Sequence, residues 1–157
     1  MWECTAPSWL MRCAMLLIVG ASALSSSALS YSRSFICFFD LDSDAINARC
    51  ELNLADYVDY WIRLRDGRLR GWPDTSFFRP YTITQVEIGG HLDAAEASQG
   101  LTVVSERRAR AVAEWLIAAG IPREYVFVTG YGDQRLLVPT PPGIAEPQNR
   151  RVEIVSR

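Results

Sequence analysis

The chain has 157 residues, of which 49% are hydrophobic and 22% are charged, and these proportions are typical of one globular domain. They exclude an intrinsically disordered chain, a collagen-like repeat and a multidomain enzyme. The 16 basic and 18 acidic residues leave a formal net charge of -2 without long runs of one sign. Nucleic acid is therefore not an expected partner.

The first thirty residues carry the pattern of a secretory signal. One positive charge precedes an apolar run, and small residues follow, with residues 21–23 fitting a leader-peptidase site. We expect a signal peptide over residues 1–23, with Met11 as the hypothetical true start. An uncleaved membrane anchor is the alternative, although the run is shorter than the roughly 20 apolar residues that a span needs. Residues 24–157 are expected to form the exported domain.

Two of the four cysteines, Cys37 and Cys50, lie in the exported part, where disulfides persist. A disulfide closing this short loop would contribute about 3 kcal/mol of stability. Two buried free thiols are the equally weighted alternative, because the sequence does not place the two Cα atoms within bridging range.

Apolar periodicity predicts the first half of the fold. Residues 35–39 form a short run of strand formers that stops at a polar turn. Residues 44–65 repeat apolar side chains at helical spacing, and an Asp-Gly pair follows as a stop. Residues 66–81 mix Gly, Pro and charge, which indicates a loop. The aromatic residues of this loop are expected to cap the core, with contact to a partner as the alternative: Trp72, Phe77 and Phe78.

The second half of the chain is predicted to contain three strands and one helix. The segments are residues 82–88 (strand), 104–119 (helix), 125–128 (strand) and 152–155 (strand). Gly89-Gly90 is interpreted as a tight strand exit, and Gly130-Tyr131-Gly132 as a turn. The resulting order β-α-β-α-β-β predicts an α+β fold in which two helices cover a sheet.

Four short motifs occur in order along the second half. They are Gly90-His91-x-Asp93, Ser105-x-x-Arg108-Ala109, Gly130-Tyr131-Gly132 and Asn149-Arg150-Arg151, and a Phe-Asp-x-Asp-Ser string at residues 39–43 precedes them. With these motifs the chain resembles the OmpA-like C-terminal domain, a peptidoglycan-binding module also found in Pal lipoproteins and flagellar stator proteins. The resemblance covers about residues 35–156 and implies a mixed sheet covered by two helices.

The resemblance also implies a ligand site. In that family the residues matching Asp93 and Arg108 clamp the diaminopimelate of the peptidoglycan stem peptide, and the residue matching Arg150 supports them. Diaminopimelate ends in an α-amino acid, so its ammonium needs a carboxylate and its carboxylate suits a planar guanidinium. We expect Asp93 to take the ammonium and Arg108 the carboxylate across a shallow groove. A surface salt bridge between the two, worth about 0 to 1 kcal/mol, is the alternative.

Three residues beside this predicted clamp are expected to support it. His91 would shape the strand exit through a hydrogen bond, Asn149 would buttress the arginines, and Ser105 belongs to the arginine motif. Two departures from the family pattern, Leu92 and Leu101, remove polar groups near the clamp and put the affinity in doubt.

The sequence therefore predicts a non-enzymatic protein that binds peptidoglycan non-covalently in the periplasm, associated with the cell wall or outer membrane. An inner-membrane location would follow from an uncleaved leader. The alternative function is an interaction module for other envelope proteins, with weak or no peptidoglycan binding. An enzyme using His91 or Cys37 is disfavoured, because the single histidine has no nucleophile or metal-ligand cluster around it. No cofactor or metal is expected.

Overall fold

The computed structural model describes residues 34–66 and 83–157. The expected signal peptide, the Met11 start and the start of the exported domain lie outside these residues, and they stay predictions. The three aromatic residues of the predicted loop also lie outside the described part of the chain: Trp72, Phe77 and Phe78.

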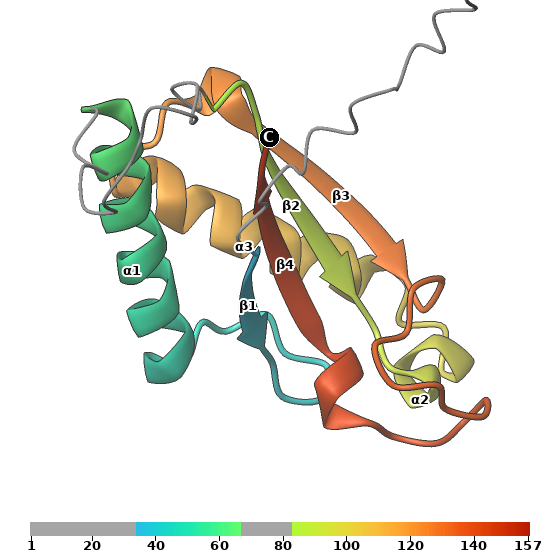
Figure 1. Cartoon of the computed structure of the whole chain (residues 1–157). Coiled ribbons are helices and arrows are strands. Elements are labelled where there is room, and N and C mark those ends of the chain that lie inside the picture. The colour runs from blue at the N-terminus through green and yellow to red at the C-terminus, as the bar shows by residue number, and fades with distance from the viewer. Residues whose placement is uncertain (1–33, 67–82) are drawn as a thin grey trace, which may run out of the picture. The chain divides into compact units, whose positions relative to one another are not determined.

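Within the described residues, four strands form one mixed sheet in the order β1-β4-β2-β3 (Figure 1). Strand β4 is antiparallel to both β1 and β2, whereas β2 and β3 are parallel. A parallel pair needs a crossover connection, and the chain between β2 and β3 supplies it with a helix. The strands are β1 (Ser34–Phe38), β2 (Val86–His91), β3 (Val126–Gly132) and β4 (Arg151–Ser156).

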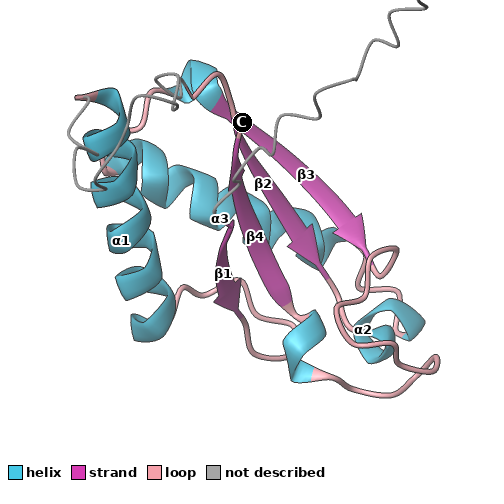
Figure 2. Ribbon diagram, viewed as in Figure 1, coloured by secondary structure: helices cyan, strands magenta, loops and turns pink. Residues whose placement is uncertain are grey.

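Two long helices, α1 (Ala48–Arg65) and α3 (Val103–Ala118), pack on one face of this sheet (Figures 1 and 2). A short helix, α2 (Ala94–Ser98), follows β2, and two single turns, η1 (Arg123–Tyr125) and η2 (Pro147–Asn149), precede β3 and β4. The predicted α+β fold is confirmed. Across residues 34–66 and 83–157, no helix combines the length and the hydropathy needed to cross a bilayer.

Helix α1 begins later than the periodicity predicted. The side chain of Asn47 accepts a hydrogen bond from the backbone N of Cys50 at 2.9 Å, so Asn47 caps the helix. The helix predicted from the apolar repeat included residues 44–47, which end at this cap and lie before the first helical residue. The helix ends at Arg65, as the following Asp-Gly pair predicted.

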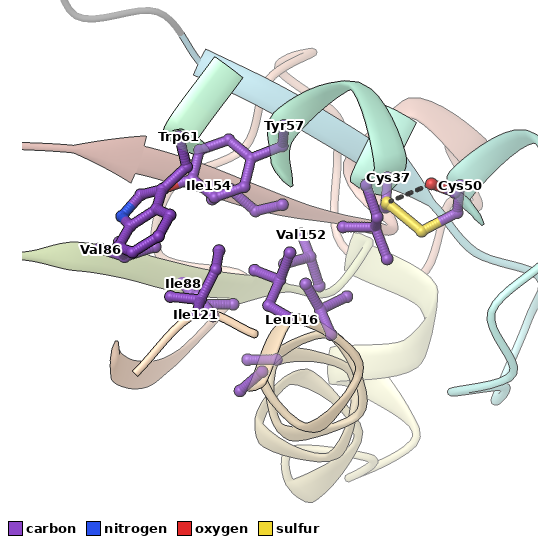
Figure 3. Close-up of a cluster of buried hydrophobic side chains, with 14 of the residues drawn as sticks. Cys37, Cys50, Tyr57, Trp61, Val86, Ile88, Leu116, Ile121, Val152 and Ile154 are labelled. Atoms are coloured by element: carbon purple, nitrogen blue, oxygen red, sulfur yellow. Dashed lines mark hydrogen bonds between the residues drawn. A yellow bond between two sulfur atoms is a disulfide. The ribbon is translucent and has the colours of Figure 1, made fainter. Parts of the chain in front are cut away.

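The hydrophobic core lies between the helices and the sheet (Figure 3). Tyr57 and Trp61 come from α1, and Leu116 comes from α3. Alternate residues of the central strands meet them, because successive side chains in a strand point to opposite faces. These core residues of the two strands are Val86, Ile88, Val152 and Ile154.

The glycines at the first and third motifs lie inside strands, so the predicted turns at these positions are wrong. Gly89 and Gly90 belong to β2, and Gly130 belongs to β3. A Cβ atom on Gly90 would come within 1.8 Å of the carbonyl oxygen of Ser105 in α3. Gly90 and Gly130 therefore allow a close approach of α3 to the sheet, and the glycines do not end the strands.

Cys37 of β1 and Cys50 of α1 are joined by a disulfide, with their Cα atoms 4.9 Å apart (Figure 3). Both residues are buried in the core. Of the two alternatives that the sequence left open, the structure contains the bridge, which ties the first strand to the first turn of the first helix.

Candidate functional site

The predicted site residues gather at one end of the sheet, where β1 and β2 end and β4 begins. His91 is the last residue of β2, Asp93 precedes α2, and Arg150 precedes β4. Arg108 reaches this end from the second turn of α3. The topology thus brings together residues from segments that lie far apart in the sequence.

Asp93 is fully buried, and its carboxylate has three hydrogen-bond partners within the protein. Its Oδ1 accepts a hydrogen bond from the backbone N of Glu96 at 2.8 Å, which caps α2. Its Oδ2 accepts a hydrogen bond from Nη1 of Arg150 at 2.7 Å and one from the backbone N of Glu146 at 3.2 Å. The carboxylate therefore joins the start of α2 to the segment before β4.

Arg108 is also fully buried, and each of its nitrogen atoms is occupied inside the protein. Its guanidinium binds the carboxylate of Glu96 in a bidentate pair, with Nη2 2.6 Å from Oε1 and Nη1 2.8 Å from Oε2. Nη2 and Nε also donate to the carbonyl oxygens of Asp40 and Ser43, both at 2.8 Å. Nη1 donates to the carbonyl oxygen of His91 at 3.1 Å.

Asp93 and Arg108 are close in the fold but are not paired with each other. Asp93 pairs with Arg150, and Arg108 pairs with Glu96, so two carboxylates and two guanidinium groups form two separate ion pairs. The surface salt bridge considered from the sequence is therefore absent, since each partner has a different, buried counter-ion. A direct role of Asp93 and Arg108 in ligand binding stays a prediction.

Sequence reasoning missed Glu96, which joins the two ends of the predicted clamp. The backbone N of Glu96 donates to the carboxylate of Asp93, and the carboxylate of Glu96 accepts from the backbone N of Asp93 at 3.4 Å. This reciprocal pair of hydrogen bonds is a capping box. The signal was available, because an Asp followed three residues later by a Glu is a helix-start pattern. The helix behind it was missed because five residues are too few to show helical periodicity.

Arg150 is the predicted site residue that retains access to solvent. Its side chain is 11% exposed and borders a surface pocket of about 250 Å³. Nη1 is held by Asp93, and Nε donates to the carbonyl oxygen of Phe39 at 3.2 Å. Its Nη2 has no hydrogen-bond partner among the described residues. The other residues that border the pocket are Phe38, Phe39, Asp40, Asn47, Pro147 and Gln148.

Ser105 and Asn149 have structural contacts instead of contacts to the arginines. The Ser105 hydroxyl donates to the carbonyl oxygen of Thr102 at 3.0 Å in the first turn of α3. Asn149 is fully buried; its Oδ1 accepts from the backbone N of Leu137 at 2.8 Å and that of Val138 at 2.9 Å. Its Nδ2 donates to the carbonyl oxygen of Val138 at 2.9 Å. Asn149 thus orders the loop before β4.

His91 is buried, and its ring makes no hydrogen bond to any described residue. The ring stacks on Tyr131 with centroids 5.3 Å apart, and the guanidinium of Arg135 lies over the Tyr131 ring, 4.0 Å from its centroid. The pKa of His91 is lowered from 6.5 to about 4, mainly by burial and also by the charges of Arg151 and Arg135, while Glu153 opposes this shift. The predicted hydrogen bond at the strand exit involves the backbone carbonyl of His91, which accepts from Arg108.

The departures from the family pattern differ in their surroundings. Leu92 is fully buried and donates its backbone N–H to the carbonyl oxygen of Gly132 at 2.9 Å. Leu101 is partly exposed before α3. Within the described segments, no three His, Cys, Asp or Glu side chains are grouped closely enough to hold a metal ion.

A family model described as the OmpA family matches residues 76–150, which include all four motifs of the second half as far as Arg150. Residues 76–150 therefore match an OmpA-family domain. An outer membrane protein of Gluconacetobacter diazotrophicus is 32% identical over 130 residues, which are 79% of this chain and 30% of the relative. A peptidoglycan-associated lipoprotein of Legionella pneumophila is 33% identical over 79 residues, 50% of this chain and 45% of the relative. The chain thus spans less than half the length of these two curated relatives.

Solved structures share the fold of this chain at lower sequence identity. The OmpA-like domain of FopA1 from Francisella tularensis matches with a TM-score of 0.56 and 22% identity, covering 79% of this chain and 71% of that one. The peptidoglycan-associated lipoprotein from Burkholderia pseudomallei matches with a TM-score of 0.57 and 21% identity, covering 80% and 90%. At these identities the likeness establishes the fold.

Proposed function

We propose that this OmpA-family domain binds peptidoglycan non-covalently in the bacterial envelope, through the diaminopimelate of the stem peptide, and catalyses no reaction. The observation that carries the proposal is the pocket bordered by Arg150 and Asp40, in which a guanidinium held by a buried carboxylate reaches solvent. The match to the OmpA family and the peptidoglycan-associated lipoprotein among the relatives support the same ligand class.

The residues around the pocket suit the chemistry of an amino-acid end group. Arg150 can donate from Nη2 to the ligand carboxylate, since Asp93 and Phe39 already fix the rest of its guanidinium. The exposed carboxylate of Asp40 supplies the opposite charge for the ligand ammonium. The apolar surfaces of Phe38 and Pro147 suit the methylene chain between the two ends of diaminopimelate. A zwitterion adds no net charge to the site.

Asp93 and Arg108 contribute from behind the pocket in this proposal. Asp93 orients Arg150 through their ion pair of 2.7 Å. Arg108 binds the carbonyl oxygens of Asp40 and Ser43 and so shapes the turn that carries Asp40. The Phe-Asp-x-Asp-Ser string therefore serves the site by its backbone as well as by the Asp40 carboxylate.

The proposed location is the periplasm, in association with the cell wall or outer membrane, after export by the leader expected from the sequence. The disulfide between Cys37 and Cys50 supports an oxidising compartment. An inner-membrane position through an uncleaved leader is the alternative, and detection of residues 11–23 on the protein in the membrane fraction would favour it.

Co-sedimentation with purified sacculi of the diaminopimelate type tests this function. The wild type is expected to pellet, and Arg150→Ala is expected to weaken binding by about tenfold or more, because one charge-assisted contact is lost. Asp93→Asn is expected to weaken it too, since Arg150 loses its counter-ion. Arg110→Ala is the matched control, because Arg110 is exposed and pairs only with Glu106 on the same helix. Equal pelleting of Arg150→Ala and wild type would contradict the assigned site.

A second candidate function is an interaction module for another envelope protein, with weak or no peptidoglycan binding. The observation that favours it is the complete occupation of Arg108 by groups of this chain. The same experiment separates the two functions, because a folded wild type that stays in the supernatant would leave the interaction module as the better account.

A further inference from the structure

The pair formed by Glu96 and Arg108 has the geometry that a ligand carboxylate bound to an arginine would have. Both side chains are fully buried, and two parallel N–H···O contacts of 2.6 and 2.8 Å join a carboxylate to a planar guanidinium. A free amino acid would present the same carboxylate to an arginine. At Arg108, however, the carboxylate belongs to the protein itself.

Glu96 is held in this position by more than Arg108. Its Oε1 also accepts from the backbone N of Asp42 at 2.9 Å, and its Oε2 accepts from the backbone N of Asp93. Its own backbone N is bound by the Asp93 carboxylate. Displacing the Glu96 side chain would break these contacts and leave a buried charge without a partner, which is strongly unfavourable.

We propose that Glu96 is a specificity-determining residue that takes the place of a ligand carboxylate at Arg108. This inference rests on the proposed function for its consequence: the ligand carboxylate is directed to Arg150, and Arg108 makes no ligand contact. Its chemical core is independent of peptidoglycan. Removing the Glu96 carboxylate leaves a cavity of carboxylate size beside a buried guanidinium, and this cavity is a binding site for small carboxylates.

Rescue by acetate tests the chemical core. Glu96→Ala is expected to melt at a lower temperature than wild type in sodium chloride, because Arg108 loses its counter-ion. Sodium acetate at the same ionic strength is expected to raise the Tm of Glu96→Ala by about 5 °C, since a ligand that binds only the folded state stabilises it. For the wild type, the Tm in acetate is expected to equal the Tm in chloride. The same is expected for Glu96→Gln, which retains the side-chain volume.

If Glu96→Ala does not fold in chloride, refolding yields in acetate and chloride provide the same comparison. A higher yield in acetate, confined to Glu96→Ala, is the expected result. An equal response of all three proteins to acetate, or no response of Glu96→Ala by either measurement, would overturn the inference.

Sacculus binding separates this inference from the proposed function. If Glu96→Ala responds to acetate while wild type stays in the supernatant, the inference about Glu96 is supported and the peptidoglycan function is contradicted. If wild type pellets while Glu96→Ala shows no acetate response, the peptidoglycan function is supported and the inference about Glu96 is contradicted.

Discussion

Replacement of His91 by Gln should remove a specific part of the acid sensitivity of folding. His91 is the only histidine of the chain, it is 2% exposed, and no described residue binds its ring nitrogens. Protonating it in the folded state would place a third positive charge beside Arg151 and Arg135, with Glu153 as the opposing charge and Tyr131 against the ring. The substitution keeps the backbone carbonyl that Arg108 requires.

The sign and size of the effect follow from the pKa of His91, which is 6.5 in the unfolded chain and about 4 in the folded one. Between these two values the unfolded state binds the additional proton, so the free energy of unfolding falls as the pH falls. Each pH unit costs about 1.4 kcal/mol in this window. The total loss, complete below about pH 4, is about 3 kcal/mol.

Urea unfolding followed by tryptophan fluorescence at several pH values between 7 and 4 would measure this loss. Wild type should lose about 2 to 3 kcal/mol more than His91→Gln between pH 6.5 and 4.5. Tyr131→Phe, which keeps the ring stack and changes no charge in this pH range, should follow the wild-type slope. Equal pH slopes for wild type and His91→Gln would refute the assignment of a neutral, buried imidazole.

Three further predictions concern the packing of the domain. Gly90→Ala should lower the free energy of unfolding, measured by chemical denaturation, by about 3 kcal/mol or more, because its Cβ would clash with a backbone oxygen. Gly89→Ala should lower it by less, because its Cβ would meet the Tyr131 ring, which can move. Similar losses for the two variants would contradict this distinction. Mutating both Cys37 and Cys50 to Ala should lower the free energy of unfolding by about 3 kcal/mol, and unchanged stability would mean that the bridge is absent in solution. Asn149→Ala should speed amide exchange at Leu137 and Val138 while leaving β4 protected; unchanged exchange at both amides would show that Asn149 does not order this loop.

The periodicity of the sequence determined most of the secondary structure. Apolar repeats located α1 and α3 to within a few residues and found all four strands, because burial of one face imposes a period of 3.6 or 2 on the chain. The order of these elements was enough to predict the α+β class. Segments with too few residues for a period, such as α2 and η2, escaped this reasoning.

The motifs named residues that the fold brings together, but not the contacts among them. Asp93, Arg108 and Arg150 gather at one end of the sheet. Spacing along the chain does not determine which carboxylate pairs with which guanidinium. The pairing depends on how the fold brings together residues far apart in sequence, such as Asp93 and Arg150, whose sequence separation is 57.

What only the tertiary structure decided was burial. The sequence around Arg108 does not distinguish an arginine that faces a groove from one that faces the interior. Its partners come from the turn after β1, the end of β2 and the start of α2. Bringing these three segments together removes water from the guanidinium, and an unsolvated charge requires a counter-ion of its own. Glu96 supplies that counter-ion, so the packing of the domain determines which arginine remains open to solvent, and this is Arg150.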